Sequence, residues 1–499
     1  MRSRRLSAVL ATAAGVLLTA TATAAHADAG PGAPGIGDPY YPDYGNGGYD
    51  VAHYGLELKY RPSDDRLEGT ATITARATQD LTRFDLDFLL DVSSVTVDGR
   101  PARFTTSGAH ELVITPARVL RKGRPLTVVV RYAGVPSTKK YGDYVGWART
   151  PDGAVAAQEP ESAWWWFPSN DHPLDKATYD IGITVPEGLQ TISNGVPTGA
   201  RTANGWTRYG WRETLPQTTY LTTLGIGRFD VHRSRTKDGL PVITAYSPDL
   251  PADEAAAARA SVERTAEVVD WESKIFGPYP FTSLGGYVPN VTSHFALETQ
   301  TRVFYSPYGF RNGPRPYLVV HENAHQWFGD SVSLARWSDI WLNEGFATYA
   351  EWLWSEQHGE GTAAELARKT YDSHPADDPF WQVKPGDPGP GENQFADAVY
   401  DRGAMALQAL RARVGDHAFF TTLRAWAARK KYGNGTIPEF IALAEHVSGQ
   451  RLGALFQTWL YTPGRPTAPP QPTAATTEPK SWSQIRQAHA ALRAPALRG

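Results

Sequence analysis

The chain has 499 residues, of which 41% are hydrophobic, 11% aromatic and 20% charged, so it can form roughly two or three domains and is not disordered over most of its length. Its formal charge of −3 excludes the basic excess that neutralises phosphates, and we expect no nucleic-acid partner. Because cysteine is absent, disulfides and thiolate ligands are excluded, and any metal ligand must be a histidine or a carboxylate.

The first 27 residues have the pattern of a secretory signal peptide. A basic head, MRSRR, precedes small and apolar residues that end in the small-x-small sequence Ala25 to Ala27. Arg4 and Arg5 partly match a twin-arginine signal, which leaves the export route open. A membrane anchor is disfavoured because the apolar run is short and Thr-rich. We expect a secreted protein without stable membrane insertion, and a flexible Gly/Pro-rich lead-in over 28–48.

Strand patterns dominate residues 49–240. Segments such as YGLELKY, GTATITARA and LTVVVRY alternate in polarity or are rich in β-branched residues, with Gly, Asp and Pro between them. This pattern predicts an all-β N-terminal domain, a sandwich or a saddle.

Helical patterns begin near Pro251. PADEAAAARASVERTAEVVDWESKIFG has an acidic first turn and a glycine stop, and helix-like segments continue to Pro466. We expect a mostly helical domain over 241–466 with a short strand-rich start. A long Pro/Gly/Asp-rich loop is predicted over 371–397. The low-complexity tail predicted over 467–499 ends in SWSQIRQAHAALRA, which is predicted to form a short helix.

The sequence HENAH places His321 and His325 four residues apart, on one face of a helix. Glu322 beside them has the position of a general base for a metal-bound water. Two histidines on a solvated face are the alternative, but the upstream run PYLVV predicts a buried helix, where unpaired charge is costly. Glu344, eighteen residues after His325, offers a third ligand and leaves one position for water, as in catalytic zinc sites.

HENAH, the eighteen-residue gap and WLNEGFATYAE resemble the aminopeptidase N family of zinc metallopeptidases, among the gluzincins. WWWFPSNDHPLDKATYD, AVYDRGAMAL and LFQTWLYTPGRP are also similar to segments of that family, so the resemblance covers roughly 45–466. It implies an N-terminal β saddle followed by a thermolysin-like (α+β) catalytic domain. It further implies one zinc ion per chain. Many members carry another helical domain after the catalytic one, and we expect a short form without it.

The resemblance also implies roles for residues outside the HENAH helix. Tyr400, in AVYDRGAMAL, would donate to the oxyanion of the tetrahedral intermediate. Glu298, in FALET, corresponds to the amine-binding glutamate of a Gly-x-Met-Glu-Asn signature. Phe295, Leu297 and Thr299 depart from that signature, and Thr299 replaces an asparagine beside the substrate backbone.

A second amine-binding glutamate lies shortly before a Phe-Pro pair in this family. Counting back from Phe167 without gaps selects Glu159, with Glu161 as the alternative. Two carboxylates near the end of a substrate would favour an ammonium group over a blocked terminus.

The expected function is therefore removal of N-terminal residues from peptides with a free N-terminus. Three alternatives stay open: a thermolysin-type zinc endopeptidase, an enzyme that opens a lipid epoxide on the same scaffold, and a secreted binding module with structural zinc. A structural site would need a fourth protein ligand, and the sequence offers none nearby. The preferred N-terminal residue and the oligomeric state are left open.

Overall fold

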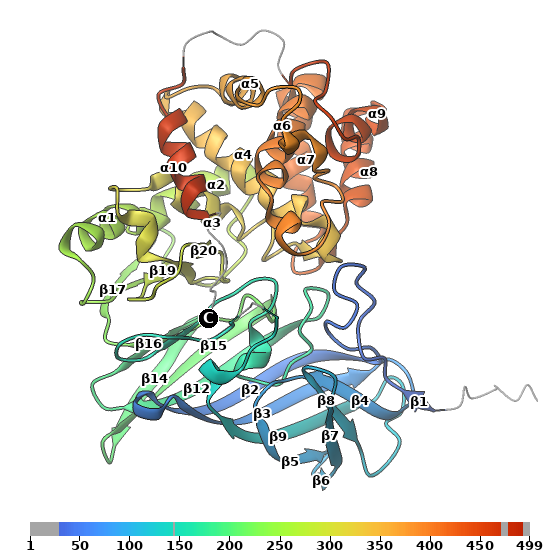
Figure 1. Ribbon diagram of the computed structural model, residues 1–499, viewed down its shortest axis with the longest axis vertical. Coiled ribbons are helices and arrows are strands. Elements are labelled where there is room, and N and C mark those ends of the chain that lie inside the picture. The colour runs from blue at the N-terminus through green and yellow to red at the C-terminus, as the bar shows by residue number, and fades with distance from the viewer. Residues whose placement is uncertain (1–28, 143–144, 471–477, 493–499) are drawn as a thin grey trace, which may run out of the picture.

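The computed structural model describes residues 29–142, 145–470 and 478–492 (Figure 1). The signal peptide predicted over 1–27 lies outside the described residues. Within the described ranges, no helix has both the length and the apolar character needed to cross a bilayer.

The N-terminal half is built of sheets, which lie below the helices in Figure 1. Its main sheet has the order β14-β15-β12-β2-β3-β9-β5-β6, and β12 pairs with β2 in parallel. Smaller sheets have the orders β1-β4-β8-β7 and β10-β11-β16-β13. The strands are β1 (Gly30–Pro31), β2 (Tyr49–Arg61), β3 (Arg66–Ala77), β4 (Leu81–Asp87), β5 (Asp91–Val97), β6 (Arg100–Pro101), β7 (Arg103–Ser107), β8 (Glu111–Thr115), β9 (Pro125–Gly134), β10 (Ala148–Arg149), β11 (Ala154–Ala156), β12 (Lys176–Pro186), β13 (Gln190–Ser193), β14 (Val196–Ala203), β15 (Trp206–Thr218) and β16 (Leu224–Gly227).

The alternation of apolar and polar residues that predicted these strands corresponds to an alternation of buried and exposed side chains in the structure. In β2, Leu56, Leu58 and Tyr60 face the core while the residues between them are exposed or half-buried. One apolar core fills this half and a second fills the helical half.

The second half carries the helices, on a five-stranded sheet of order β17-β18-β19-β21-β20. The expected order, a sheet-rich part followed by a mostly helical part, is confirmed. The remaining elements are β17 (Asp230–Arg235), β18 (Pro241–Tyr246), α1 (Ala252–Val262), α2 (Thr265–Phe276), β19 (Leu284–Val288), β20 (Ala296–Leu297), β21 (Val303–Tyr305), α3 (Pro316–Ala324), β22 (Ser333–Leu334), α4 (Trp341–His358), α5 (Ala363–Ser373), α6 (Asp397–Val414), α7 (Asp416–Arg429), β23 (Asn434–Gly435), α8 (Ile437–Ser448), α9 (Gly453–Phe456) and α10 (Trp482–Leu492).

The domain boundary expected at 240/241 falls inside this second sheet. Residues 230–235 form β17, which pairs antiparallel with β18 over 241–246. The edge strand thus comes from the stretch that the sequence pattern assigned to the N-terminal domain, because an alternating strand carries no mark of the sheet that it joins.

The lead-in expected to be flexible is held in place over its described part, 29–48. Asp38 is buried and accepts from the backbone N–H of Trp337 at 2.7 Å, and it lies 3.0 Å from His172 Nε2. The Tyr41 hydroxyl donates to Gln394 Oε1 at 2.7 Å. Buried polar and aromatic contacts to both halves outweigh the flexibility that Gly and Pro suggest.

The long loop predicted over 371–397 is partly ordered as well. Single 3₁₀ turns occupy Pro379–Gln382 and Gly391–Phe395. The buried guanidinium of Arg402 donates to the carbonyl oxygens of Trp381 at 2.8 Å and Val383 at 3.1 Å, which fixes the loop against α6.

Candidate active site

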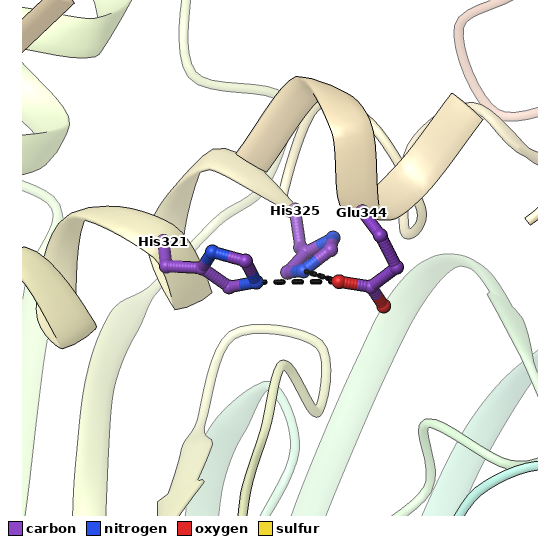
Figure 2. A group of neighbouring side chains, drawn as sticks. All are labelled: His321, His325 and Glu344. Carbon is purple, nitrogen blue, oxygen red and sulfur yellow. Dashed lines mark hydrogen bonds and ion pairs between the residues drawn. The ribbon is translucent and has the colours of Figure 1, made fainter. Parts of the chain in front are cut away.

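The two histidines of the HENAH sequence come from the end of α3, and Glu344 comes from the first turn of α4 (Figure 2). His321 Nε2 lies 3.2 Å and His325 Nε2 lies 3.5 Å from Glu344 Oε2. All three side chains are buried. The connection between the helices, residues 325–340, thus brings Glu344 to the two neighbouring histidines.

Both imidazoles are oriented through their other nitrogen. His321 Nδ1 lies 2.8 Å from Glu351 Oε1, and His325 Nδ1 lies 3.1 Å from the carbonyl oxygen of Phe328. Each Nδ1–H therefore has an acceptor, and each Nε2 lone pair is directed toward Glu344.

This donor set fits zinc. Two imidazole nitrogens and a carboxylate are the ligands of a catalytic zinc site. Ligands at about 2.0–2.1 Å from a tetrahedral ion lie roughly 3.3 Å from one another. The observed 3.2 and 3.5 Å separations match that spacing, and the ligand atoms of all three residues lie within 4.8 Å of one another, so His321, His325 and Glu344 would hold the ion.

The side chain of Glu322 lies next to this cluster and is also buried. Burial raises the pKa of its carboxyl well above the ordinary value, against the attraction of His325. The negative charges of Glu298 and Glu344 raise it further. A carboxylate in this environment binds a proton readily, as a general base must.

The phenol ring of Tyr400, on α6, is stacked on His321 with ring centroids 6.0 Å apart. Helix α6 reaches this position because Gly345 of α4 and Gly403 of α6 meet at the crossing. A Cβ on Gly403 would lie 2.6 Å from Trp341 Cδ1, and Trp341 Nε1 donates to the Gly403 carbonyl at 3.0 Å. The glycine pair thus allows the helix approach that places Tyr400 at the cluster.

Glu298 directly follows β20. It is buried, its Oε1 accepts from the Tyr220 hydroxyl at 3.2 Å, and its backbone carbonyl accepts from Gln326 Nε2 at 2.9 Å. Burial raises its pKa, the charge of Glu344 adds to this, and His325 opposes it. The carboxyl is therefore close to the cluster.

Glu159, and not Glu161, is within the influence of the charges of this cluster. Burial, then the charges of Glu298 and Glu344, raise the pKa of Glu159 well above its ordinary value. The pKa of Glu161 is also raised by burial, but its neighbours are Tyr44 and Asp171 within the N-terminal half.

The departure at Thr299 has a local structural role. Its hydroxyl donates to the Arg302 carbonyl at 2.6 Å, and the residue is fully buried. Thr299 therefore stabilises its own loop, which carries Glu298.

Sequence reasoning missed Glu351, Tyr220 and Gln326. Glu351 lies two helical turns after Glu344 on α4, a spacing that signals a shared face. Gln326 follows the HENAH sequence directly. Tyr220 has no local signal, since only the fold brings it to Glu298.

Comparison with known proteins is consistent with this geometry. Residues 51–221 match the Peptidase M1 N-terminal domain and residues 315–459 match the Peptidase family M1 domain. The chain is 30% identical to an M1 zinc metallopeptidase from Deinococcus radiodurans, covering 89% of this chain and 100% of that one, with a TM-score of 0.79. A variant of that protein has been solved with a Tyr-Ser-Ala substrate bound.

Curated relatives include Aminopeptidase M1 of Arabidopsis thaliana, 26% identical over 82% of this chain and 50% of the relative. Aminopeptidase N of Streptomyces lividans is 31% identical over 60% of this chain and 36% of the relative. The chain thus spans about half the length, or less, of these curated relatives. The chain belongs to peptidase family M1, the zinc metallopeptidases.

Proposed function

We propose that the protein is a zinc aminopeptidase, which removes residues from the free N-terminus of peptides. The observation that carries the proposal is the pair of carboxyl groups, Glu298 and Glu159, beside the His321–His325–Glu344 cluster. An α-ammonium group bound between two carboxylates belongs to the same residue as the reacting carbonyl, so its binding places the cut after the first residue. The names of the relatives and the tripeptide bound to the Deinococcus protein support this assignment.

Zinc, when bound, would polarise the scissile carbonyl and lower the pKa of water so that hydroxide is available near neutral pH. Glu322 accepts the proton of the attacking water and delivers it to the leaving amine. The Tyr400 hydroxyl donates a hydrogen bond to the oxyanion that develops on the substrate carbonyl. Glu298 and Glu159 orient the substrate through its ammonium group, so that the first peptide bond reaches Glu322.

A panel of aminoacyl anilides and their N-acetyl forms tests the proposal. Zinc-loaded protein is expected to hydrolyse the free anilides and to leave the acetylated ones intact, because acetylation removes the charge that Glu298 and Glu159 bind. Chelation should abolish the activity and added zinc should restore it. Cleavage of the N-acetyl anilides, or of internal peptide bonds, at a comparable rate would instead establish the endopeptidase alternative.

We further propose that the protein is exported, on the strength of the signal pattern at 1–27. Expression of the full chain in a secreting bacterial host is expected to release protein that begins at Asp28. N-terminal sequencing of the medium fraction measures this, and intact chains retained in the cytoplasm would contradict it.

A further inference from the structure

Helix α10, in the stretch expected to be a low-complexity tail, packs against the catalytic half. Ile485 and Ala488 are buried in the same apolar core as α3 and α4. At its start, the hydroxyls of Ser481 and Ser355 lie 2.7 Å apart, and the Ser481 N–H donates to the Glu360 carbonyl at 3.2 Å. The helix is therefore held by both polar and apolar contacts.

The inner face of α10 presents His489 to two buried carboxylates. His489 Nε2 lies 3.0 Å from Glu351 Oε1, and His489 Nδ1 lies 3.3 Å from Asp401 Oδ1. Arg486, one turn earlier, lies 3.0 Å from Asp401 Oδ2. An imidazole between two buried carboxylates can donate to one or both and offset the charge that their burial leaves.

Glu351 Oε1 is the oxygen that also holds His321 Nδ1, at 2.8 Å. One carboxylate oxygen thus joins α10 to a zinc ligand. Asp401, the other contact of His489, directly follows Tyr400 on α6. Outer partners of this kind fix the orientation of a ligating imidazole, and their loss typically costs about 10–100-fold in metal affinity or activity.

We infer that α10 is a working part of the zinc site, and that His489 is a positioning residue that fixes Glu351 against His321. Among the described residues, the ligand cluster itself comes from α3 and α4 and not from α10. Helix α10 sets the orientation of His321 from outside, and through Asp401 it ties the start of α6 to the same network. The inference rests on the metal site and not on the aminopeptidase assignment.

Two substitutions of His489, by glutamine and by asparagine, separate this positioning role from simple packing. The amide nitrogen of a glutamine lies near the place of an imidazole Nε2, so His489→Gln retains a donor to Glu351. The amide of an asparagine lies near the place of Nδ1, so His489→Asn loses that donor while it stays polar. His489→Ala removes both contacts, and Gln487→Ala, on the exposed side of α10, is the control.

The measurement is the zinc affinity of the full-length protein, by competition with a chromogenic chelator, together with kcat and KM. We expect His489→Ala and His489→Asn to bind zinc about 10-fold or more weakly, with a lower kcat and little change in KM. His489→Gln should recover most of the affinity, and Gln487→Ala should match the unaltered chain.

Equal zinc affinity in the glutamine and asparagine variants would overturn the inference, and so would wild-type affinity in His489→Ala. If His489→Ala does not fold, the comparison of glutamine with asparagine still decides. The zinc measurement needs no substrate, so a failure of the aminopeptidase assignment leaves this test intact.

Discussion

Two buried clusters in this protein have the residue types of a metal site, and only one has the surroundings of one. Among the residues that the structure describes, His321, His325 and Glu344 form the first, and Asp87, His110 and Glu111 form the second. In each, the ligand atoms lie within 4.8 Å of one another. Residue type and proximity therefore do not distinguish them.

The difference lies in what holds each imidazole. In the first cluster, both Nδ1 atoms contact an acceptor, and both Nε2 atoms are left for an ion. In the second cluster, His110 Nε2 already contacts the Asp43 carbonyl at 3.0 Å, and lies 3.3 Å from Asp87. Its Nδ1 has no hydrogen-bond partner within the described ranges. The orientation suits a proton donor at Nε2, not a metal ligand.

The charges of the second cluster agree with this interpretation. Burial alone would lower the pKa of His110, but its hydrogen bond with Asp87 and the charge of that carboxylate raise it to about 9. Burial, followed by the charge of Asp87, raises the pKa of Glu111 to about 8. Burial also raises the pKa of Asp87, against its hydrogen bond with His110. With His110 positive near pH 7 and both carboxyls holding protons more tightly than usual, the cluster needs no ion.

The largest expected contrast is in zinc content. His321→Ala should abolish stoichiometric zinc binding and lower kcat/KM by roughly 10³-fold or more, since acid–base and oxyanion contributions both depend on the ion. His110→Ala should leave zinc near one per chain and activity unchanged. Metal analysis of dialysed protein measures both. Half the zinc lost in His110→Ala would show that the second cluster binds the ion as well.

The next contrast exchanges a buried glutamate for glutamine, Glu322 beside the first cluster and Glu111 within the second. Glu322→Gln should retain zinc and lose about 10²–10⁴-fold in kcat, because the amide cannot accept the proton of water. Glu111→Gln should leave kcat unchanged. Steady-state kinetics on an aminoacyl anilide with parallel metal analysis measure the pair, and substantial turnover by Glu322→Gln would remove that residue from the mechanism.

A smaller effect is expected from Tyr400→Phe. Loss of one oxyanion donor should lower kcat about 10²–10³-fold while zinc content is retained. The control is Tyr349→Phe, since that buried hydroxyl donates to Gln408 Oε1 at 2.7 Å, in the helix pair α4–α6 rather than toward the cluster. Its loss should reduce thermal stability and not kcat. Equal kcat losses in both variants would assign the effect to helix packing.

The sequence predicts the first cluster but not the second, and the reason is physical. His321 and His325 follow the spacing of one helical turn, and Glu344 follows at the eighteen-residue interval of the family motif, so a sequence pattern predicts all three. For the second amine-binding glutamate, the sequence selected Glu159 and left Glu161 as an alternative, and only the fold shows the neighbours of each. The contact between His489 and Glu351 joins positions 138 residues apart, and no local pattern encodes it.

Long-range pairing also explains what the sequence could not predict in the fold. The period of two correctly predicted a sheet-rich N-terminal half, yet β17 joined the second sheet because strand pairing is decided by tertiary contacts. Asp87 and His110 come together in the same way, from the end of β4 and from the residue before β8. Asp87 and His110 are as far apart in sequence as His321 and Glu344, at 23 residues, but they belong to no spacing motif that would mark them as partners.

The smallest effect is a change in the pH dependence of stability. In the unfolded chain Glu111 loses its proton near its ordinary pKa of 4.5, whereas in the folded chain it keeps it until about 8. Between these values the folded state binds more protons, so stability falls as the pH rises through this range. Glu111→Gln removes this loss. It should therefore stabilise the protein at pH 8 relative to pH 5, by about 1–3 kcal/mol.

Thermal unfolding at pH 5 and pH 8 measures that change as the difference between the variant and the unaltered chain at each pH. Glu187→Gln is the control, since the Glu187 carboxyl is exposed in the same half of the protein. The stability difference between this variant and the unaltered chain should be equal at pH 5 and pH 8. An offset for Glu111→Gln that is also independent of pH would mean that Glu111 is ionised in the folded protein. The second cluster would then hold two negative carboxylates against one imidazolium, and that excess charge would again call for a bound cation.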